Sequence, residues 1–244
     1  MRADSLKPKH IDALVQRWQD QAISTGTLKN RMSALRWWAQ KVNKDNVIAR
    51  DNSHYGIAPR HLVSNKSKAK DLPATALAKI QDPYVRLALM LQQVFGLRRE
   101  EAIKLSPTYA DQGDRLLLKP TWTKGGRARE IPIHTDEQRE VLKQVHALAG
   151  RGSLIPPNLR YVDQLRRYEY QVSQAGLSKM HGLRHAYAQR RYEELTGRSC
   201  PVAGGPRRAE LTPEQRVQDQ AARLTISREL GHEREQITAV YVGK

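Results

Sequence analysis

The sequence contains a single cysteine, one phenylalanine and no long apolar run. With Cys200 alone, the chain cannot form an internal disulfide or a thiolate-rich zinc site, which excludes the disulfide-stapled secreted domains. Its first residues, MRADSLKPKH, lack the apolar core of a signal peptide, and no segment approaches the roughly 18 to 20 apolar residues of a membrane-spanning helix. We therefore expect a soluble, cytoplasmic protein that does not enter a membrane.

Acidic residues are scarce relative to basic ones. The 244 residues include 42 Lys or Arg and 25 Asp or Glu, which gives a formal charge of +17 and a pI of about 10.2. Such an excess favours a polyanionic partner, because Lys and Arg side chains neutralise phosphates and release their counterions. Nucleic acid is the leading candidate. A ribosomal or histone-like protein shares this property, so the charge indicates a class of partner and leaves the chemistry open.

Residues 1–63 are predicted to form a small helical domain. In the stretches IDALVQRWQDQAI and TLKNRMSALRWWAQKV the apolar side chains recur every three or four positions, which predicts two amphipathic helices. Residues 1–70 contain 14 Lys or Arg and 5 Asp or Glu, about half of the net charge. We expect this domain to grip DNA, and the candidate contacts are Lys29, Arg31, Arg36 and Lys41.

A polar, basic segment without periodicity, residues 64–73, is expected to link this domain to a second one at residues 74–244. Within the second domain, Asp82 and Pro83 have the residue types of an N-cap and a first helical position, and Gly96 lies near the end of the helix that they begin. A further helix is expected to start close to residue 98.

Short apolar segments at 116–118 and 131–133 predict two strands joined in a small sheet or hairpin, with Gly125 and Gly126 accepting positive φ at its turn. The sequences T-D-E-Q at 135–138 and T-P-E-Q at 212–215 match capping boxes and predict two more helix starts. The predicted fold is therefore mainly α-helical, with one small antiparallel β-hairpin.

Five polar residues of this second part have spacings that suggest a site. His181 and Arg184 lie three positions apart, so on a helix they project from one face and can reach one phosphate. Arg98 and Glu101 share that spacing. Tyr241 follows much later, and its phenol is a poor nucleophile near neutral pH unless cations or a base surround it. Each pair, taken alone, is typical of an exposed helix face or a weak surface ion pair.

The segments nevertheless occur in a fixed order that resembles the tyrosine recombinase family, the phage integrases and their relatives, over roughly residues 75–244. GLRREEAIKL is similar to the first arginine motif, TKGGRAREIPI to the β-hairpin lysine motif, HGLRH to the HxxR motif, and LGH followed nine residues later by Tyr to the terminal box. The resemblance implies that Glu101 supports a set of six catalytic residues. These are Arg98, Lys124, His181, Arg184, His232 and Tyr241.

The resemblance implies a recombinase that cuts and rejoins duplex DNA. Arg98 and Arg184 would hold the scissile phosphate through charge-assisted bonds while Tyr241 attacks the phosphorus and forms a 3′-phosphotyrosyl bond. Because that bond conserves the phosphodiester energy, no cofactor is expected. Lys124 is the expected general acid for the leaving 5′-oxygen.

The remaining roles are also inherited from the resemblance. His181 is expected to accept or relay the tyrosine proton, and His232 to hydrogen-bond the phosphate. Glu101 is expected to orient His181 or Arg98. Arg99 competes with Arg98, but neighbouring helical residues point about 100° apart, so only one of the two can face the phosphate.

A zinc site built from His181, His185 and His232 is an alternative, because two histidines four positions apart on a helix are a common ligand pair. The glutamate of the HExxH pattern is missing, so we expect no metal. Two functional alternatives also remain open. One is a catalytically idle DNA-binding or regulatory protein with this fold, and the other is relaxation of supercoiled DNA in the manner of a type IB topoisomerase.

The expected partner is double-stranded DNA, with monomers in solution, a tetramer on paired sites and possible accessory bending or directionality factors. By the same resemblance, a mobile element in a bacterial cytosol or nucleoid is the expected setting. The 47 residues between Arg184 and His232 exceed the compact family pattern, and the Gly-, Pro- and Arg-rich loop 196–211 accounts for much of the excess. Its role, and any exchange of a C-terminal helix between protomers, stay open.

Overall fold

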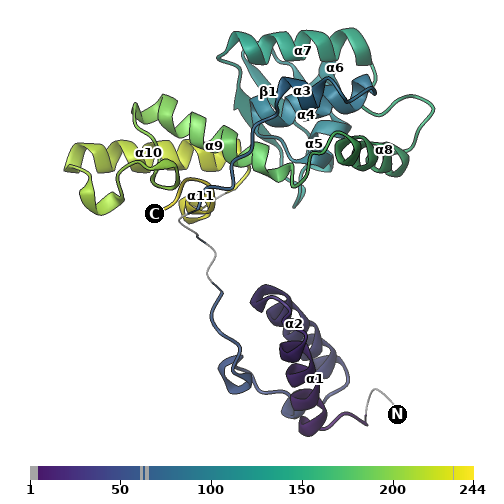
Figure 1. Ribbon diagram of the computed structural model, residues 1–244, viewed down its shortest axis with the longest axis vertical. Helices are drawn as coiled ribbons and strands as arrows, with labels where there is room; N and C mark the ends of the chain where they lie inside the picture. The colour runs from purple at the N-terminus through teal and green to yellow at the C-terminus, as the bar shows by residue number, and fades with distance from the viewer. Residues whose placement is uncertain (1–4, 61–62, 64–65, 233) are drawn as a thin grey trace. The chain divides into compact units, whose positions relative to one another are not determined.

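The computed structural model describes residues 5–60, 63, 66–232 and 234–244. The chain divides into two compact units, Met1–Leu62 and Val63–Lys244, and Figure 1 shows the elements of each. Within the described residues, no helix combines the length and the apolar character that a membrane span requires.

The first unit is built on two helices, α1 (Pro8–Asp20) and α2 (Thr25–Lys41), followed by 3₁₀ turns at Asp45–Val47 and Ser53–Tyr55. Both helices lie where the apolar periodicity predicted them. The buried side chains that join them to the following turns are Ile11, Val15, Leu28, Met32, Ala39, Val47, Ile48 and Ile57.

The second unit begins with a group of helices around a hairpin. These elements are α3 (Ala74–Leu77), α4 (Pro83–Phe95), α5 (Arg99–Lys104), α6 (Pro107–Ala110), β1 (Arg115–Leu118), β2 (Arg129–Pro132), α7 (Asp136–Ala149) and α8 (Tyr161–Gln174). The strands pair antiparallel, with Leu116 opposite Ile131 and Leu118 opposite Arg129. The mainly helical fold with one small antiparallel hairpin, predicted from the sequence, is confirmed.

Three later helices, α9 (His181–Thr196), α10 (Pro213–Glu229) and α11 (Glu235–Val242), lie together at one end of this unit in Figure 1. α9 packs against α4, and α11 packs against both α9 and α10. This arrangement brings the C-terminal segment next to the end of α4, although about 140 residues of sequence separate them.

The helix boundaries follow the predicted capping signals. Asp82 accepts hydrogen bonds from the backbone N–H groups of the first turn of α4, and Gly96 ends that helix in the left-handed conformation. Thr135 and Thr212 each close a capping box, at the start of α7 and α10. Gly125 and Gly126 both have positive φ at the hairpin turn, as predicted.

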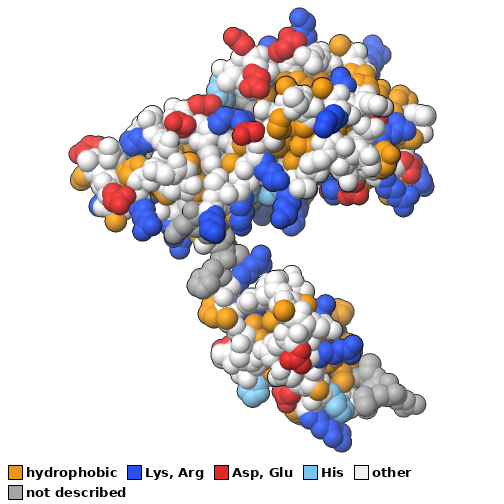
Figure 2. All heavy atoms as spheres, in the orientation of Figure 1, with side chains coloured by type: hydrophobic (Ala, Val, Ile, Leu, Met, Phe, Trp, Pro, Cys, Tyr) orange, Lys and Arg blue, Asp and Glu red, His pale blue; other side chains and the backbone are white. Residues whose placement is uncertain are grey.

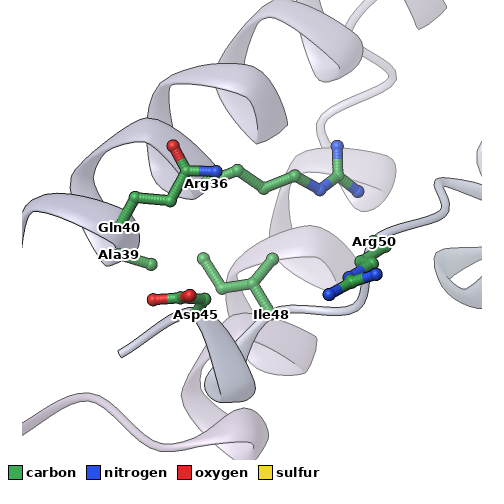
Figure 3. A pocket seen from close by; sticks show the side chains of 6 residues that line it. All are labelled: Arg36, Ala39, Gln40, Asp45, Ile48 and Arg50. Atoms are coloured by element: carbon green, nitrogen blue, oxygen red, sulfur yellow. The ribbon is translucent and has the colours of Figure 1, made fainter. Parts of the chain in front are cut away.

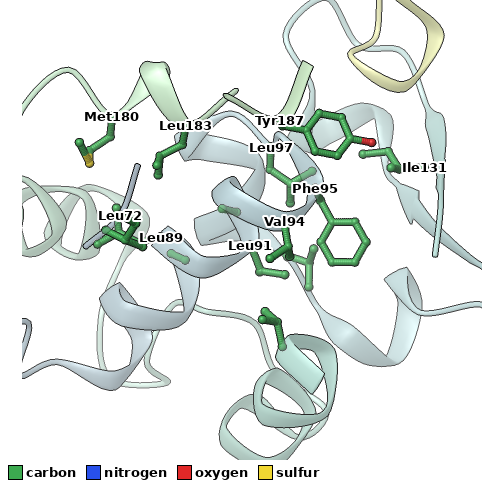
Figure 4. Packing of buried hydrophobic residues seen from close by; sticks show 14 of the residues in the cluster. Leu72, Leu89, Leu91, Val94, Phe95, Leu97, Ile131, Met180, Leu183 and Tyr187 are labelled. Atoms are coloured by element: carbon green, nitrogen blue, oxygen red, sulfur yellow. The ribbon is translucent and has the colours of Figure 1, made fainter. Parts of the chain in front are cut away.

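The core of the second unit is centred on α4. Figure 4 shows Leu89, Leu91, Val94 and Phe95 of this helix surrounded by side chains from the hairpin and α9, among them Ile131 and Tyr187. Leu72, from the segment predicted as a linker, is also buried in this cluster. Burying side chains of this size contributes roughly 1.5 to 3 kcal/mol each, so α4 is a rigid base for the residues at its end.

The described residues of the predicted linker, 66–73, lie in the second unit and contact α9. The backbone N–H of Lys70 donates to the carbonyl of Gly182 at 3.1 Å, and Ser67 Oγ is bonded to the side chain of Gln189. The predicted loop 196–211 is also ordered by internal contacts, with 3₁₀ turns at Pro201–Ala203 and Arg208–Glu210.

Gly96 offers a test of how tightly α4 and α9 approach. Its φ is +61°, and a Cβ there would lie 2.5 Å from the ring of Tyr187. Gly96→Ala should therefore cost about 3 kcal/mol of unfolding free energy, since backbone strain and overpacking add. The control Gly113→Ala has φ +87° with open space around it, and should cost only about 1 kcal/mol. Urea unfolding measures both values, and equal costs would contradict the close packing.

Candidate active site

Residues far apart in the sequence converge where α4 ends and α9, α10 and α11 meet. Arg98 is the N-cap residue of α5, His181 and Arg184 lie on the first turn of α9, His232 follows α10, and Tyr241 lies on α11. All belong to the second unit. Lys124 is the exception among the six predicted catalytic residues, because it lies on the exposed turn of the hairpin.

The Tyr241 side chain is almost fully buried among cationic and aromatic groups. Its hydroxyl oxygen lies 3.4 Å from Nε of Arg184, which donates to it, and 3.3 Å from Nε2 of His232. The His185 ring lies 4.6 Å from the tyrosine ring, centroid to centroid, and the His181 ring lies 6.2 Å away. The predicted nucleophile is therefore held by its own chain within a cluster of Arg184, His181, His185 and His232, which is called the pocket below.

Arg184 lies at the bottom of this pocket, with only 1% of its surface exposed. Its Nη1 donates to the carbonyl of Gly96 at 2.5 Å, and its Nη2 donates to the carbonyl of Leu230. Burial lowers the pKa of Arg184 to about 10, so the guanidinium is still charged at neutral pH. A guanidinium has five N–H donors, and three of them donate to the described residues.

The Glu101 carboxylate is fully buried and binds two arginines. Arg129 donates to it from Nη1 and Nη2, both at 2.7 Å, and Arg98 donates from Nη1 at 2.7 Å and from its backbone N–H at 2.6 Å. Burial alone would raise the pKa of Glu101, but hydrogen bonding and the charge of Arg129, aided by Arg184 and Arg98, lower it to about 2. Glu101 therefore holds Arg98, which is one of the two residues that it was expected to orient.

The histidines of the pocket are neutral near pH 7. Burial lowers the pKa of His181, and the positive charges of Arg184 and Arg98 lower it further. The same causes, burial first, lower the pKa of His232 to about 4. A neutral imidazole can accept a proton on one nitrogen. In this structure it is the His232 ring, not the His181 ring predicted for that role, that lies within hydrogen-bonding distance of the phenol.

The zinc alternative can be compared with the same geometry. His181, His185 and His232 all surround the Tyr241 ring, and the rings of His181 and His185 meet edge to face. Burial and neighbouring cations lower the pKa of His185 to about 4. Across residues 5–60, 63, 66–232 and 234–244, no three His, Cys, Asp or Glu side chains are grouped as metal ligands.

Lys124 and Arg99 lie outside the pocket. Arg99 forms an exposed ion pair with Glu169 at 2.8 Å, whereas Arg98 is bonded to the buried Glu101. The Lys124 side chain is exposed at the hairpin turn, beside two glycines of positive φ. Such a turn can change its backbone conformation at low cost, so Lys124 is well placed to move.

Two residues of the site were not singled out from the sequence. Arg129 is buried, binds Glu101 with both Nη atoms and donates from Nε to the carbonyl of Glu229 at 2.9 Å. A weak signal existed, because Arg129 has the same strand parity as Ile131 and so faces the core. His185 was considered only as a zinc ligand, although it lies one helical turn after His181 on the same face.

The four side chains of the first unit that were predicted to contact DNA differ in how far their charged groups are used within the protein. Arg36 donates to the carbonyl of Ala49 at 3.0 Å and to Asn52 at 2.9 Å, so its guanidinium is partly used within the unit. It also lines a pocket of about 290 Å³ with Arg50 and Asp45 (Figure 3). Arg31 lies over the Trp18 ring. Among the described residues, neither Lys29 nor Lys41 donates a side-chain hydrogen bond, and Lys41 Nζ lies 6.0 Å from the centre of the Trp37 ring.

Basic side chains gather along one edge of the second unit in Figure 2, with histidine visible among them. A single-signed surface of this kind raises the local concentration of a polyanion and speeds its binding.

The pH dependence of stability tests the buried Glu101 network. Because the pKa of Glu101 is about 2 in the folded protein against a usual 4.5, its contribution is complete above about pH 4.5 and is lost as the pH falls towards 2. This difference between the usual pKa and the pKa in the folded protein corresponds to about 3 kcal/mol of unfolding free energy. Glu101→Gln should therefore unfold about 3 kcal/mol more easily than the native chain at pH 7, with a smaller gap at pH 3.

A matched control is Glu100→Gln. Glu100 is the neighbouring residue and pairs with Lys104 at the surface, so its removal should change stability by less than about 1 kcal/mol at either pH. Urea unfolding of the three proteins at pH 7 and pH 3 gives the comparison. A gap for Glu101→Gln that stays constant between the two pH values would contradict the low pKa.

Comparison with known proteins agrees with this geometry. A family model described as Integrase matches residues 62–190, and a second, described as Phage integrase, N-terminal, matches residues 1–48. The terminal box with Tyr241 lies beyond the first match. No curated protein sequence matches the chain significantly.

Several solved structures share the fold. A lambda integrase dimer bound to a COC′ core site superposes with a TM-score of 0.60 at 19% identity, over 98% of this chain and 65% of that chain. The Tn1549 transposon integrase in complex with circular intermediate DNA gives 0.58 at 17% identity, over 100% of this chain and 83% of the other.

The XerH site-specific recombinase bound to difH gives a TM-score of 0.55 at 16% identity, over 98% of this chain and 68% of the other. The chain thus spans about two thirds of the length of the lambda integrase that it matches. The first family match alone covers more than half of the residues, and the fold likeness extends over nearly all of them. The chain belongs to the phage integrase family, the tyrosine recombinases.

Proposed function

We propose that the protein is a site-specific DNA recombinase that cuts and rejoins duplex DNA through a 3′-phosphotyrosyl intermediate. One observation carries the proposal: the Tyr241 hydroxyl lies between Arg184 Nε and His232 Nε2 in a buried basic pocket. Two other buried tyrosines of this unit, Tyr187 and Tyr192, donate to carboxylates, whereas the Tyr241 oxygen faces a guanidinium and an imidazole, which are the groups that suit a nucleophile. Family membership and a charge of +17 support DNA as the substrate.

The proposed cleavage is an in-line displacement at phosphorus. The phenolic oxygen of Tyr241 forms a bond to the phosphorus while the bond from phosphorus to the 5′-oxygen breaks. The remaining N–H donors of Arg184, together with Arg98, stabilise the charge on the non-bridging oxygens, and a preorganised, buried donor is worth far more there than in water. Attack by the free 5′-hydroxyl reverses the step, so no cofactor is required.

Two protons must move in this step. His232 is the better-placed acceptor for the phenolic proton, since it is neutral and lies 3.3 Å from the hydroxyl. His181 remains close enough to relay that proton or to contact the phosphate. Lys124 supplies the proton that the leaving 5′-oxygen needs, once the hairpin turn closes on bound DNA.

Duplex DNA is the proposed partner of both units. The family match over residues 1–48 supports a DNA-binding role for the first unit, in which phosphate contacts position the enzyme and a few base contacts select the site. Lambda integrase forms a tetramer on a Holliday junction, and we propose the same assembly here on paired sites, from monomers in solution. Accessory bending or directionality factors and a location in the bacterial cytosol or nucleoid belong to the same proposal.

Trapping of a covalent adduct tests the proposal directly. Nicked suicide duplexes are built on DNA fragments that the protein selects from the genomic DNA of its host. The native chain should form a protein-DNA adduct that survives denaturing electrophoresis, and Tyr241→Phe should form none while binding the DNA within about twofold. Tyr170→Phe, which changes an exposed tyrosine, should form the adduct normally.

Each alternative function has its own outcome in that assay. Binding by the native chain without any adduct would favour the idle DNA-binding protein. An adduct together with relaxation of supercoils, but without joining of two different duplexes, would favour the topoisomerase-like activity. Joining of two duplexes supports the recombinase.

Lys124 can be tested through the leaving group. Lys124→Ala should slow cleavage of ordinary DNA by about 10² to 10⁴, the usual contribution of a general acid. A 5′-sulfur leaving group needs no proton, because a thiol has a pKa of about 8.5. Replacing the 5′-bridging oxygen by sulfur should therefore restore the variant to nearly the native rate.

Lys119→Ala is the control for this test. Lys119 is another lysine of the hairpin, with its Nζ 4.1 Å from the centre of the Tyr109 ring, and any defect that it causes should not depend on sulfur. A Lys124→Ala defect that sulfur leaves unchanged would remove Lys124 from the role of proton donor.

A further inference from the structure

The long loop between α9 and α10 folds over the end of α11. Cys200 of this loop is almost fully buried, and the turn Pro201–Ala203 contacts α11. The approach is close at Gly243, where a Cβ would lie 2.8 Å from Val202 Cγ1 and 3.0 Å from the backbone nitrogen of Val202. The backbone that follows Tyr241 is therefore enclosed by the loop.

Arg223 holds the same segment from α10. Its Nη1 donates to the carbonyl of Gly243 at 2.7 Å, and its own backbone carbonyl accepts from Thr238 Oγ1 at 3.1 Å. The guanidinium is buried and is oriented by Asp219, which accepts from Nε at 2.9 Å. Asp219 also accepts from the Tyr192 hydroxyl of α9 at 2.6 Å. Arg223 thus links α10 to Thr238 within α11 and to Gly243 just after it, and Asp219 extends the link to α9.

A third anchor acts on the nucleophile residue itself. Gln189 Nε2 of α9 donates to the backbone carbonyl of Tyr241 at 3.1 Å, and Val242 is fully buried. The backbone is therefore fixed at Tyr241 and two residues beyond it. A phenol on such a backbone can turn about its own side-chain bonds, but it cannot reach a neighbouring protein unless α11 detaches.

We infer that Arg223, Asp219 and the loop 199–205 form a clasp that fixes the backbone of α11 and thereby positions the Tyr241 phenol for attack. The inference rests on the proposed function, because it explains how the nucleophile is directed to the phosphate. Within the described residues, the Arg223 guanidinium bonds Asp219 and the carbonyl of Gly243 and lies over the Tyr192 ring, so Arg223 acts as a positioning residue through the backbone of α11 and touches no reacting atom.

The first test loosens the clasp without leaving a lone buried charge. Arg223→Met alone would leave the Asp219 carboxylate buried and unpaired, which destabilises a fold strongly. The double variant Asp219→Asn with Arg223→Met removes both charges and keeps an acceptor for Tyr192. Hydrogen exchange of the peptide 235–244 should become at least tenfold faster, and covalent adduct formation at least tenfold slower, at unchanged DNA affinity.

The control removes an ion pair elsewhere. Asp111→Asn with Arg139→Met breaks a pair between α7 and the end of α6, and it should change neither the exchange of 235–244 nor the rate of adduct formation. A clasp variant whose C-terminal peptide exchanges faster, yet which forms the adduct at the native rate, would overturn the positioning role.

The second test keeps the clasp intact and asks where Tyr241 acts. Tyr241→Phe supplies a complete pocket without a nucleophile, and Arg98→Ala supplies a nucleophile with a damaged pocket. The two chains, tagged to differ in size, are mixed on suicide DNA that carries paired sites. The inference expects no more adduct from the mixture than from Arg98→Ala alone. Additional adduct on the Arg98→Ala chain would show donation to a neighbour and would overturn it.

The two tests separate the clasp from the proposed function. If the native chain forms no adduct on any selected DNA, the recombinase proposal fails, while the exchange rates of 235–244 still measure the clasp. If the clasp variant does not fold, Val202→Ala, which reduces the packing of the loop on Gly243 without touching a buried charge, is measured in the same way, and unchanged exchange of 235–244 together with a native rate of adduct formation would overturn the clasp.

Discussion

The second unit depends on one buried carboxylate. Glu101 receives two hydrogen bonds from Arg129 and two from Arg98, and Arg129 in turn bonds the carbonyl at the end of α10. Through these contacts, the start of α5, the second strand and the end of α10 are held together around a single negative charge. Without it, two guanidiniums would face each other in a region from which water is largely excluded, and neither would be held in place.

Much of the framework could be read from the sequence because local rules decide it. Asp82 and Gly96 bound α4, Thr135 and Thr212 open two helices, and the glycine pair makes the hairpin turn. These signals depend on a few neighbouring residues, so they need no knowledge of the fold. The order of the motifs was similarly informative, since three of the four carry residues that meet at the end of α4, Lys124 of the hairpin motif being the exception.

What the sequence could not give is pairing between distant segments. Nothing local indicates that Arg129 shares the carboxylate of Glu101, 28 positions away, or that Arg223 bonds a backbone carbonyl of the C-terminal segment. The distribution of roles between His181 and His232 also depended on how α11 packs, because that packing decides which imidazole meets the phenol. The composition of the loop 196–211, rich in Gly, Pro and Arg, indicated only an insertion between two helices. It did not indicate that the loop packs on the end of α11.

The acceptors that hold Arg184 are the carbonyls of Gly96 and Leu230, which are parts of the main chain. Every amino acid carries that group, so a change of side chain at position 230 leaves the oxygen in place, and only a shift of the backbone can remove it. The arginine is therefore secured against most substitutions around it. At position 96 the residue type is limited by the positive φ and by the nearby Tyr187 ring, so glycine there serves the backbone conformation that presents the carbonyl, while at position 230 the anchor is independent of the side chain.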